Sequence, residues 1–107
     1  MRRYGARVDA NQGEVVDAIR AVGGVVTYLF KVGDGVADLL VSFRGQWYVF
    51  EVKDGAKVAS RRALNPEEKK WIAEQRAPVH VVNNAAEALA KLEAQKFGAA
   101  DARKILG

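Results

Sequence analysis

Residues 36–53 read VADLLVSFRGQWYVFEVK and predict a β-hairpin. The runs VADLLVSF and QWYVFEVK are rich in β-branched and aromatic residues, which favour strands. The dipeptide Arg44-Gly45 between them has the length of a tight hairpin turn. Such a turn pairs Phe43 with Gln46 and thereby fixes the register of the two strands.

Three charged residues share the open end of this hairpin. The register brings Asp38 opposite Glu51, with Cβ atoms about 5 Å apart. Side chains alternate along a strand, so Lys53 projects from the same face as Glu51. Two facing carboxylates repel each other unless a cation lies between them, and a divalent metal ion beside a lysine would supply that charge.

The alternative is a solvated ion pair between Glu51 and Lys53, worth less than about 1 kcal/mol. The apolar neighbours of Asp38 and Glu51 favour the metal site, because unpaired charges inside such strands are destabilising. The hairpin therefore predicts the outline of a phosphodiester-cleaving site.

The composition is that of one small basic domain. The chain has 107 residues, 50% of them hydrophobic, and residues 1–107 are expected to form a single domain. Cysteine is absent, which excludes disulfides and thiolate zinc sites. No apolar run approaches the roughly 20 residues that span a bilayer, and no apolar signal region follows the N-terminus. These features predict a cytoplasmic protein with no membrane partner.

Basic residues outnumber acidic ones, 17 against 13, which gives a formal net charge of +4 and favours nucleic acid as a partner. Two basic clusters are candidates for contacts with the DNA backbone, and solvated loops and ends are the alternative. The clusters consist of Arg2, Arg3 and Arg7 near the start, and of Lys57, Arg61 and Arg62 after the hairpin.

A helix and a strand are expected before the hairpin. The helix begins at Asn11, with Glu14 in a capping-box position, and ends at Gly23-Gly24. A strand follows over residues 25–32, and Gly33-Asp34-Gly35 turns the chain into the hairpin, so the three strands form an antiparallel meander. The core stripe expected for the helix is Val15, Ala18, Ile19 and Val22.

The second half of the chain predicts two further helices and one strand. Asn65-Pro66-Glu67-Glu68 starts a helix that carries Trp71 and Ile72 inward and ends near residues 76–78. A short buried strand over residues 79–82 follows. The last helix starts at Asn84 with Glu87 in the box position, has Ala88, Leu89 and Leu92 as its core stripe, breaks at Phe97-Gly98, and precedes a helical turn over residues 102–106.

The resulting fold class is α/β, with the order α-β-β-β-α-β-α and a small mixed sheet flanked by helices on both faces. This order, with an acid on the first helix, an Asp after a Gly-rich turn and Glu-x-Lys on the next strand, resembles the PD-(D/E)XK nuclease superfamily and its restriction-endonuclease-like core. Three segments are similar to the virus-type replication-repair nuclease domain (VRR-NUC) in its standalone phage and bacterial form: residues 35–41 (GVADLLV), 50–53 (FEVK) and 64–68 (LNPEE).

The resemblance covers about residues 11–92 and has two departures. Ala37 stands where the family usually has proline, which shapes the turn and carries no chemistry. Lys69 stands where the family often has glutamine, and it adds a cation near the site that could contact DNA.

The resemblance implies a role for each residue of the site. Asp38 and Glu51 would bind Mg²⁺ or Mn²⁺, with the Val52 carbonyl as a further oxygen ligand. Lys53 would orient the attacking water, neutralise charge on the phosphate or act as a base. Glu14 matches the helix-borne acid near the metal, and a capping role is equally open, since one carboxylate can do both.

Other polar and aromatic residues have simpler interpretations. Asp34 lies between two glycines and fits turn chemistry better than the role of Asp38. His80 is expected to be an ordinary strand residue. Trp47, Tyr48 and Trp71 could stack on bases, but their apolar neighbours predict core positions.

The predicted function is that of a metal-dependent, structure-selective DNA endonuclease similar to a Holliday-junction resolvase. Two symmetric cuts need a homodimer, and the alanine-rich segment from Ala85 to Ala102 is the first candidate for its interface, with domain swapping as a second route. The alternatives are a nuclease or nickase on flaps, forks or single strands, and a catalytically silent nucleic-acid-binding module.

Overall fold

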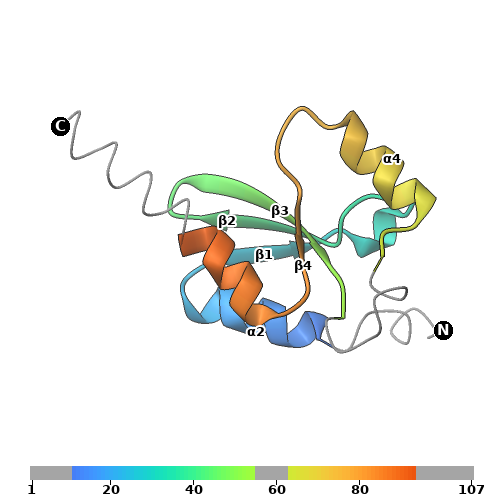
Figure 1. Cartoon of the computed structure of the whole chain (residues 1–107). Coiled ribbons are helices and arrows are strands. Elements are labelled where there is room, and N and C mark those ends of the chain that lie inside the picture. Colours follow the sequence, from blue (N-terminus) through green and yellow to red (C-terminus); the bar gives the residue numbers. More distant parts are fainter. Residues whose placement is uncertain (1–10, 55–62, 94–107) are drawn as a thin grey trace.

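The computed structural model describes residues 11–54 and 63–93. Four strands form one mixed sheet in the order β1-β2-β3-β4, and three helices pack around it (Figure 1). The bounds are α2 Gln12–Ala21, β1 Val25–Tyr28, the 3₁₀ turn η1 Phe30–Val32, β2 Leu39–Phe43, β3 Gln46–Val52, α4 Pro66–Glu74 and β4 His80–Val82, followed by a helix over residues 85–93. The predicted α/β order and the mixed sheet are confirmed.

The hairpin has the predicted turn and register. Arg44 and Gly45 both lie in the left-handed region, with φ of 49° and 84°, as a two-residue turn between twisted strands requires. Phe43 pairs with Gln46, and the ladder continues to Leu39 opposite Phe50.

The predicted first strand is too long. Strand β1 ends at Tyr28 because Leu29 adopts φ −111° and ψ −4°, outside the extended region. The Val32 N–H then donates to the Leu29 carbonyl (2.9 Å), which closes the η1 turn. The segment Gly33-Asp34-Gly35 turns the chain back with φ between 57° and 81°, and β2 begins later than predicted, at Leu39.

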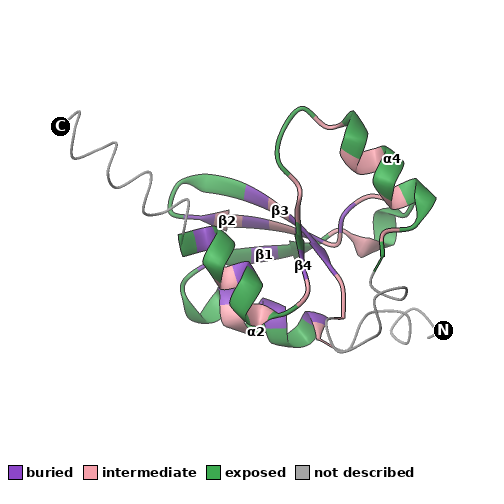
Figure 2. Cartoon of the chain, in the orientation of Figure 1, coloured by how far each residue is buried: buried purple, intermediate pink, exposed green. Residues whose placement is uncertain are grey.

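One face of the sheet carries the core. Helix α2 and the helix over residues 85–93 lie on this face, and Figure 2 shows the buried positions concentrated between them and the strands. The buried cluster consists of Val15, Val16, Ile19, Val26, Leu39, Val41, Phe43, Tyr48, Phe50, Val52, Val82, Ala88 and Leu92.

The core stripe predicted for α2 is partly wrong. Val15 and Ile19 are buried as predicted, but Ala18 is only half-buried and Val22 is exposed. Val22 is the C-cap, where the helix has already ended, and its place in the core is taken by Val16. Gln12, a polar residue, is buried as well.

Helix α4 stands apart from this core. None of its nine described residues is buried, and Trp71 and Ile72, predicted to face inward, are half-buried. The helix begins at Pro66 as predicted, because Asn65 accepts from the Glu68 N–H while Glu68 accepts from the Asn65 N–H. It ends at Glu74, earlier than predicted.

Strand β4 returns parallel to β3, as expected for a strand–helix–strand crossover, and pairs His80 with Phe50. Of its three residues only Val82 is fully buried, so the prediction of a buried strand is wrong for Val81, which is exposed. The last helix has its predicted cap, with the Asn84 side chain accepting from the Glu87 N–H (2.8 Å). Its predicted stripe is confirmed: Ala88 and Leu92 are buried, and Leu89 packs against the core.

The break predicted at Phe97-Gly98 and the helical turn predicted over residues 102–106 lie outside the described residues. Within the described ranges, no helix has the length and apolar character needed to cross a bilayer.

Candidate active site

Asp38 lies where the three antiparallel strands meet. Its N–H donates to the Phe50 carbonyl (3.1 Å), and its carbonyl accepts from the Leu29 N–H (2.7 Å). The regular pairing of β2 with β3 ends at Leu39 and Phe50, and the bond from Asp38 to Phe50 does not extend it to Glu51. The two bonds nevertheless hold Asp38 beside the Glu51–Val52 end of β3. Its carboxylate oxygen Oδ2 accepts from the Val52 N–H (2.7 Å).

Glu51 is the one charged residue in the buried set of the described chain, and only 3% of it is exposed. Since neighbours alternate along β3, it faces away from the core residues Phe50 and Val52. Burial raises the pKa of Glu51 from 4.5 to about 9, and the nearby carboxylates of Asp38 and Glu68 add to the rise. This environment therefore favours the protonated form of the side chain at neutral pH.

Lys53 and Glu68 complete the cluster. The Lys53 ammonium lies 2.9 Å from Glu68 Oε1 and 3.6 Å from Glu51 Oε2. Burial pushes the pKa of Glu68 up, but hydrogen bonds from Glu51, the Asn65 N–H and Lys53 outweigh it, and the net pKa is lowered. Protonated Glu51 thus donates to ionised Glu68, and Lys53 stays beside both.

Glu68 was not singled out from the sequence. The sequence marks Glu68 as a capping residue at the start of α4, but a capping pattern does not predict which part of the sheet that helix start approaches. The close approach depends on Gly35, where a Cβ atom would overlap the Glu67 carbonyl and lie 3.0 Å from the Glu68 nitrogen. A glycine in the turn before β2 therefore lets the start of α4 reach the site.

Asn11 has a different role from the predicted one. Its side chain makes no capping bond to the described helix, and its backbone is helical, with φ −81° and ψ −3°. Instead Nδ2 donates to the carbonyls of Lys53 (2.8 Å) and Asn83 (2.7 Å), so Asn11 ties the start of α2 to the ends of β3 and β4. The predicted capping box with Glu14 is wrong.

Glu14 is exposed in the first turn of α2. Among residues 11–54 and 63–93, no group of three or more His, Cys, Asp or Glu side chains is arranged to hold a metal ion. Glu14 therefore does not join Asp38 and Glu51 in such a group, and the third carboxylate of the cluster is Glu68.

The remaining residues of the predicted site are dispersed. Val52 contributes its N–H to Asp38, while the role of its carbonyl as a ligand stays a prediction. Lys69 is exposed on α4. The basic residues Arg2, Arg3, Arg7, Lys57, Arg61 and Arg62 lie outside the described part of the chain.

The residues for which the sequence predicted no catalytic role lie partly in the core and partly on the surface. Asp34 is exposed in its turn, and His80 packs against the rings of Phe50 and Tyr48 with centroids 5.5 and 6.0 Å away. Tyr48 is a core residue as predicted. Trp47 is not, because it is 72% exposed on the sheet face opposite the core.

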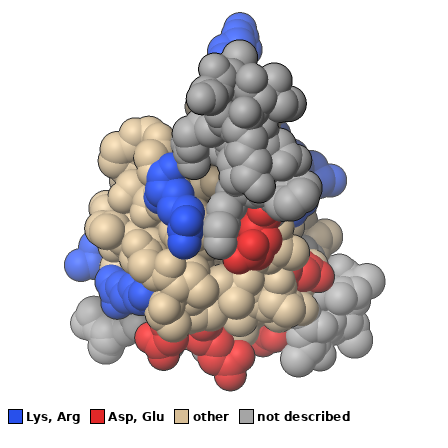
Figure 3. Space-filling view, turned by 90° about the vertical axis from the view of Figure 1, so that its left-hand side faces the viewer, with Lys and Arg blue, Asp and Glu red and all other residues tan. Residues whose placement is uncertain are grey.

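The surface charge is mixed on the side of the molecule shown in Figure 3, which is the left-hand side of Figure 1. Blue basic and red acidic side chains are separated there by other residues. The described part of this side therefore offers no continuous basic surface for a DNA backbone.

The donor chemistry of the cluster suits a hard divalent cation. Asp38 and Glu51 offer carboxylate oxygens, the ligands that Mg²⁺ and Mn²⁺ prefer. Burial is the main cause of the raised pKa of Glu51, and the Asp38 carboxylate adds to it; a cation between the two carboxylates would oppose this second contribution. Comparisons with protein-family models, with curated proteins and with solved structures give no match to this chain.

Proposed function

We propose that this chain is a metal-dependent endodeoxyribonuclease of the PD-(D/E)XK type, similar to the standalone VRR-NUC domains. The observation that carries the proposal is the buried Glu51 carboxyl beside Asp38, with Lys53 on the same strand end. A buried acid with a strongly raised pKa next to a second carboxylate is a common mark of a functional site.

The residues that would hold Mg²⁺ or Mn²⁺ are Asp38 and Glu51, with the Val52 carbonyl as a further oxygen donor. When bound, such an ion polarises the scissile phosphate and lowers the pKa of a water molecule that attacks it. Glu51 can serve as a ligand only after it loses its proton, so uptake of the ion displaces the proton that Glu51 shares with Glu68.

Lys53 supplies positive charge toward the phosphate. Its ammonium is held between Glu68 at 2.9 Å and Glu51 at 3.6 Å, which fixes its direction. A positioned cation stabilises the extra negative charge of the transition state without reorganisation. Among the roles left open by the sequence, this geometry favours charge neutralisation.

Branched DNA is the proposed substrate, and a homodimer the proposed assembly. A domain of 107 residues has little room for a base-reading element, so recognition by shape and backbone is expected. Backbone contacts would come from Lys69 and from the basic residues Arg2, Arg3, Lys57, Arg61 and Arg62. Two symmetric cuts in a four-way junction require two sites related by a two-fold axis.

The second candidate is a catalytically silent nucleic-acid-binding module. It is favoured by the lack of a three-ligand group among the described residues and by the hydrogen bonds through which Glu51, Glu68 and Lys53 satisfy one another.

Cleavage of labelled four-way, flap, single-stranded and duplex DNA in Mg²⁺, Mn²⁺ or EDTA decides between the candidates. We expect metal-dependent cuts that are strongest on one branched substrate and absent in Asp38→Asn. Sedimentation with and without the junction tests the dimer. Binding without cuts in either metal would overturn the nuclease and leave the silent module, while cuts by a monomer would remove the junction-resolving activity.

A further inference from the structure

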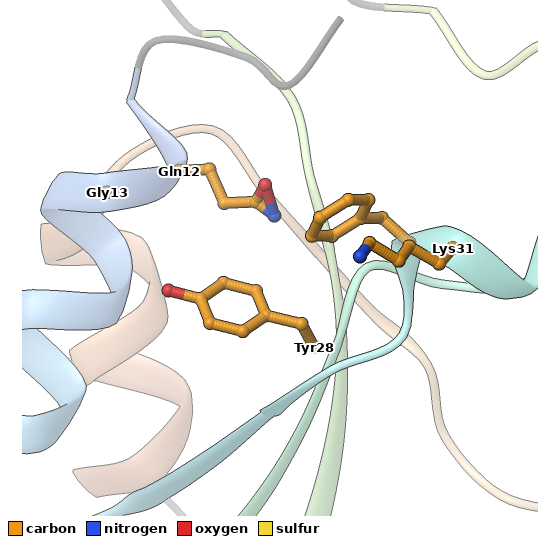
Figure 4. Close-up of a pocket in the computed structure, with 5 residues that line it drawn as sticks. Gln12, Gly13, Tyr28 and Lys31 are labelled. Carbon is orange, nitrogen blue, oxygen red and sulfur yellow. The ribbon is translucent and has the colours of Figure 1, made fainter. Parts of the chain in front are cut away.

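A hollow of about 610 Å³ lies between the start of α2 and the chain that leaves β1 (Figure 4). It is lined by Gln12, Gly13, Tyr28, Phe30 and Lys31. Its volume falls in the range of pockets that bind small molecules or single groups of larger ones. Neither the proposed metal ligands nor Lys53 belong to its lining.

Gln12 brings an unusual polar group to this hollow. The residue is 3% exposed, and its Nε2 is buried with no hydrogen-bond partner among the residues that the structure describes. Figure 4 shows its amide directed into the hollow, above the Tyr28 ring. A buried donor without an acceptor destabilises a fold, so it points to a ligand that supplies the acceptor.

Two aromatic rings form the apolar part of the lining. The centroids of Tyr28 and Phe30 lie 5.8 Å apart at an interplanar angle of 78°, and Tyr28 is 47% exposed. Two cations accompany them, because Lys31 lines the hollow and the Arg20 guanidinium lies 5.9 Å from the Tyr28 centroid. Aromatic rings beside cations suit a flat π-system attached to a negative group.

A smaller hollow of about 390 Å³ has the opposite character. Its lining holds three carboxylates, of Asp34, Glu67 and Glu74, against the single ammonium of Lys70, so an anionic ligand would meet net repulsion. Charge and the unpartnered Gln12 amide therefore both favour the larger hollow as the binding site for an anionic ligand.

We propose that the larger hollow binds one unpaired nucleobase of the DNA strand. The base contacts Tyr28 and Phe30, an acceptor on its edge receives the hydrogen bond of Gln12, and Lys31 lies near its phosphate. The inference rests on the proposed nuclease function and names a feature of its substrate, an unpaired nucleotide near the cleaved bond. Asn11, the neighbour of Gln12, connects the hollow to the site through its bond to the Lys53 carbonyl (2.8 Å).

The test measures binding without cleavage. Single-stranded DNA that carries the fluorescent base 2-aminopurine is titrated with the full chain in EDTA, and quenching reports stacking. Tyr28→Leu should weaken binding about tenfold, in line with the loss of one base–aromatic contact. Trp47→Leu is the matched control, since Trp47 is an exposed aromatic outside the hollow, and it should leave binding unchanged.

Gln12→Leu separates a binding role from a structural one. It removes the unpartnered donor, so the melting temperature should rise while binding weakens. Lys31→Ala should reduce the salt dependence of binding, and Lys70→Ala, at an exposed lysine on α4, should not.

Quenching that Tyr28→Leu leaves intact would overturn the proposal, and so would equal losses in Tyr28→Leu and Trp47→Leu. A mononucleotide that competes as well as the strand would assign the hollow to free nucleotides and overturn the strand proposal. If quenching depends on Tyr28 but the chain never cleaves DNA, the nuclease proposal is refuted and base binding in the hollow stands. If the chain cleaves DNA without such quenching, base binding in the hollow is refuted and the nuclease proposal stands.

Discussion

Consecutive residues of β3 face two different environments at equal burial. Phe50 is fully buried among apolar side chains beneath the helices, whereas Glu51 is 3% exposed among other carboxylates on the opposite face. Burying Phe50 stabilises the fold, since a phenyl side chain removed from water contributes about 2–3 kcal/mol. Burying Glu51 opposes folding in its charged form. The core face therefore stabilises the fold, whereas the opposite face buries a carboxyl group that destabilises the fold when it is charged. Such a group is typical of a functional site.

Helices α2 and α4 differ in the same way. Helix α2 packs Val15, Val16 and Ile19 into the core, but α4 has no buried residue within its described bounds. A polar contact between Glu68 and Lys53 joins α4 to the end of β3. Substitutions on the core face should therefore change stability, and substitutions on the charged face should change activity.

The largest effect is expected for cleavage. Asp38→Ala, Glu51→Ala and Lys53→Ala should each lower the cleavage rate on the order of 10³-fold with the fold intact, because each removes metal charge or phosphate neutralisation. Rates on the preferred substrate are compared with circular dichroism of the same samples. Glu14→Gln is the informative control, because full activity would show that Glu14 takes no part in cleavage. Full activity in Asp38→Ala would refute the site.

On the core face, Phe50→Ala should lower the free energy of unfolding by about 3–5 kcal/mol, because it leaves a cavity between sheet and helices. Denaturant titration measures the change. Trp47→Ala on the same strand should change it by less than about 0.5 kcal/mol, because that side chain is 72% exposed. Similar losses in both variants would contradict the assignment of the two faces.

The next effect concerns pH. The folded state raises the pKa of Glu51 from 4.5 to about 9, so it binds this proton more tightly than the unfolded chain does. The stabilisation of the folded state by this more tightly bound proton is complete below about pH 4.5 and is lost as the pH rises toward 9. In metal-free buffer, Glu51→Gln should therefore become progressively more stable than wild type as the pH rises across this window, and the two should differ least near pH 4.5.

Melting temperatures of both proteins at several pH values check this difference, because titrating groups that do not contact Glu51 are common to the two proteins. A difference that stays constant with pH would mean that Glu51 is already ionised in the folded protein.

The smallest effect is expected at the start of α4. Asn65→Ala should cost about 1 kcal/mol by removing the cap, whereas Asn65→Gly should cost only a few tenths. Because the same box holds Glu68 beside Lys53, Asn65→Ala should also reduce cleavage. Unchanged stability and cleavage would show that the capping box does not position Glu68.

The sequence predicted what depends on local chemistry. The two-residue turn and the alternation of side chains fixed the hairpin register, so Asp38 and Lys53 fell at one end of the hairpin with Glu51. Strand ends were harder, because the apolar pattern of β1 continues through η1 after the backbone has left the extended region. Trp47 was misplaced because composition does not say which sheet face stays uncovered.

Contacts between distant elements were not predictable in this way. Asn11 reaches the carbonyl of Lys53, and Glu68 reaches its ammonium, only because α2 and α4 are placed against the same end of β3. Turn and capping patterns report on neighbours in sequence, so they identified both residues as helix-start residues and neither as part of the site.

The most direct measurement of the central claim is calorimetric titration of the protein with Mn²⁺ at about pH 7 in two buffers of different ionisation enthalpy. If Glu51 is a protonated acid that becomes a metal ligand, binding should release about one proton per ion, and Glu51→Gln should bind more weakly and release none. Wild-type protein that binds no Mn²⁺, or proton release that is the same in Glu51→Gln, would contradict the account.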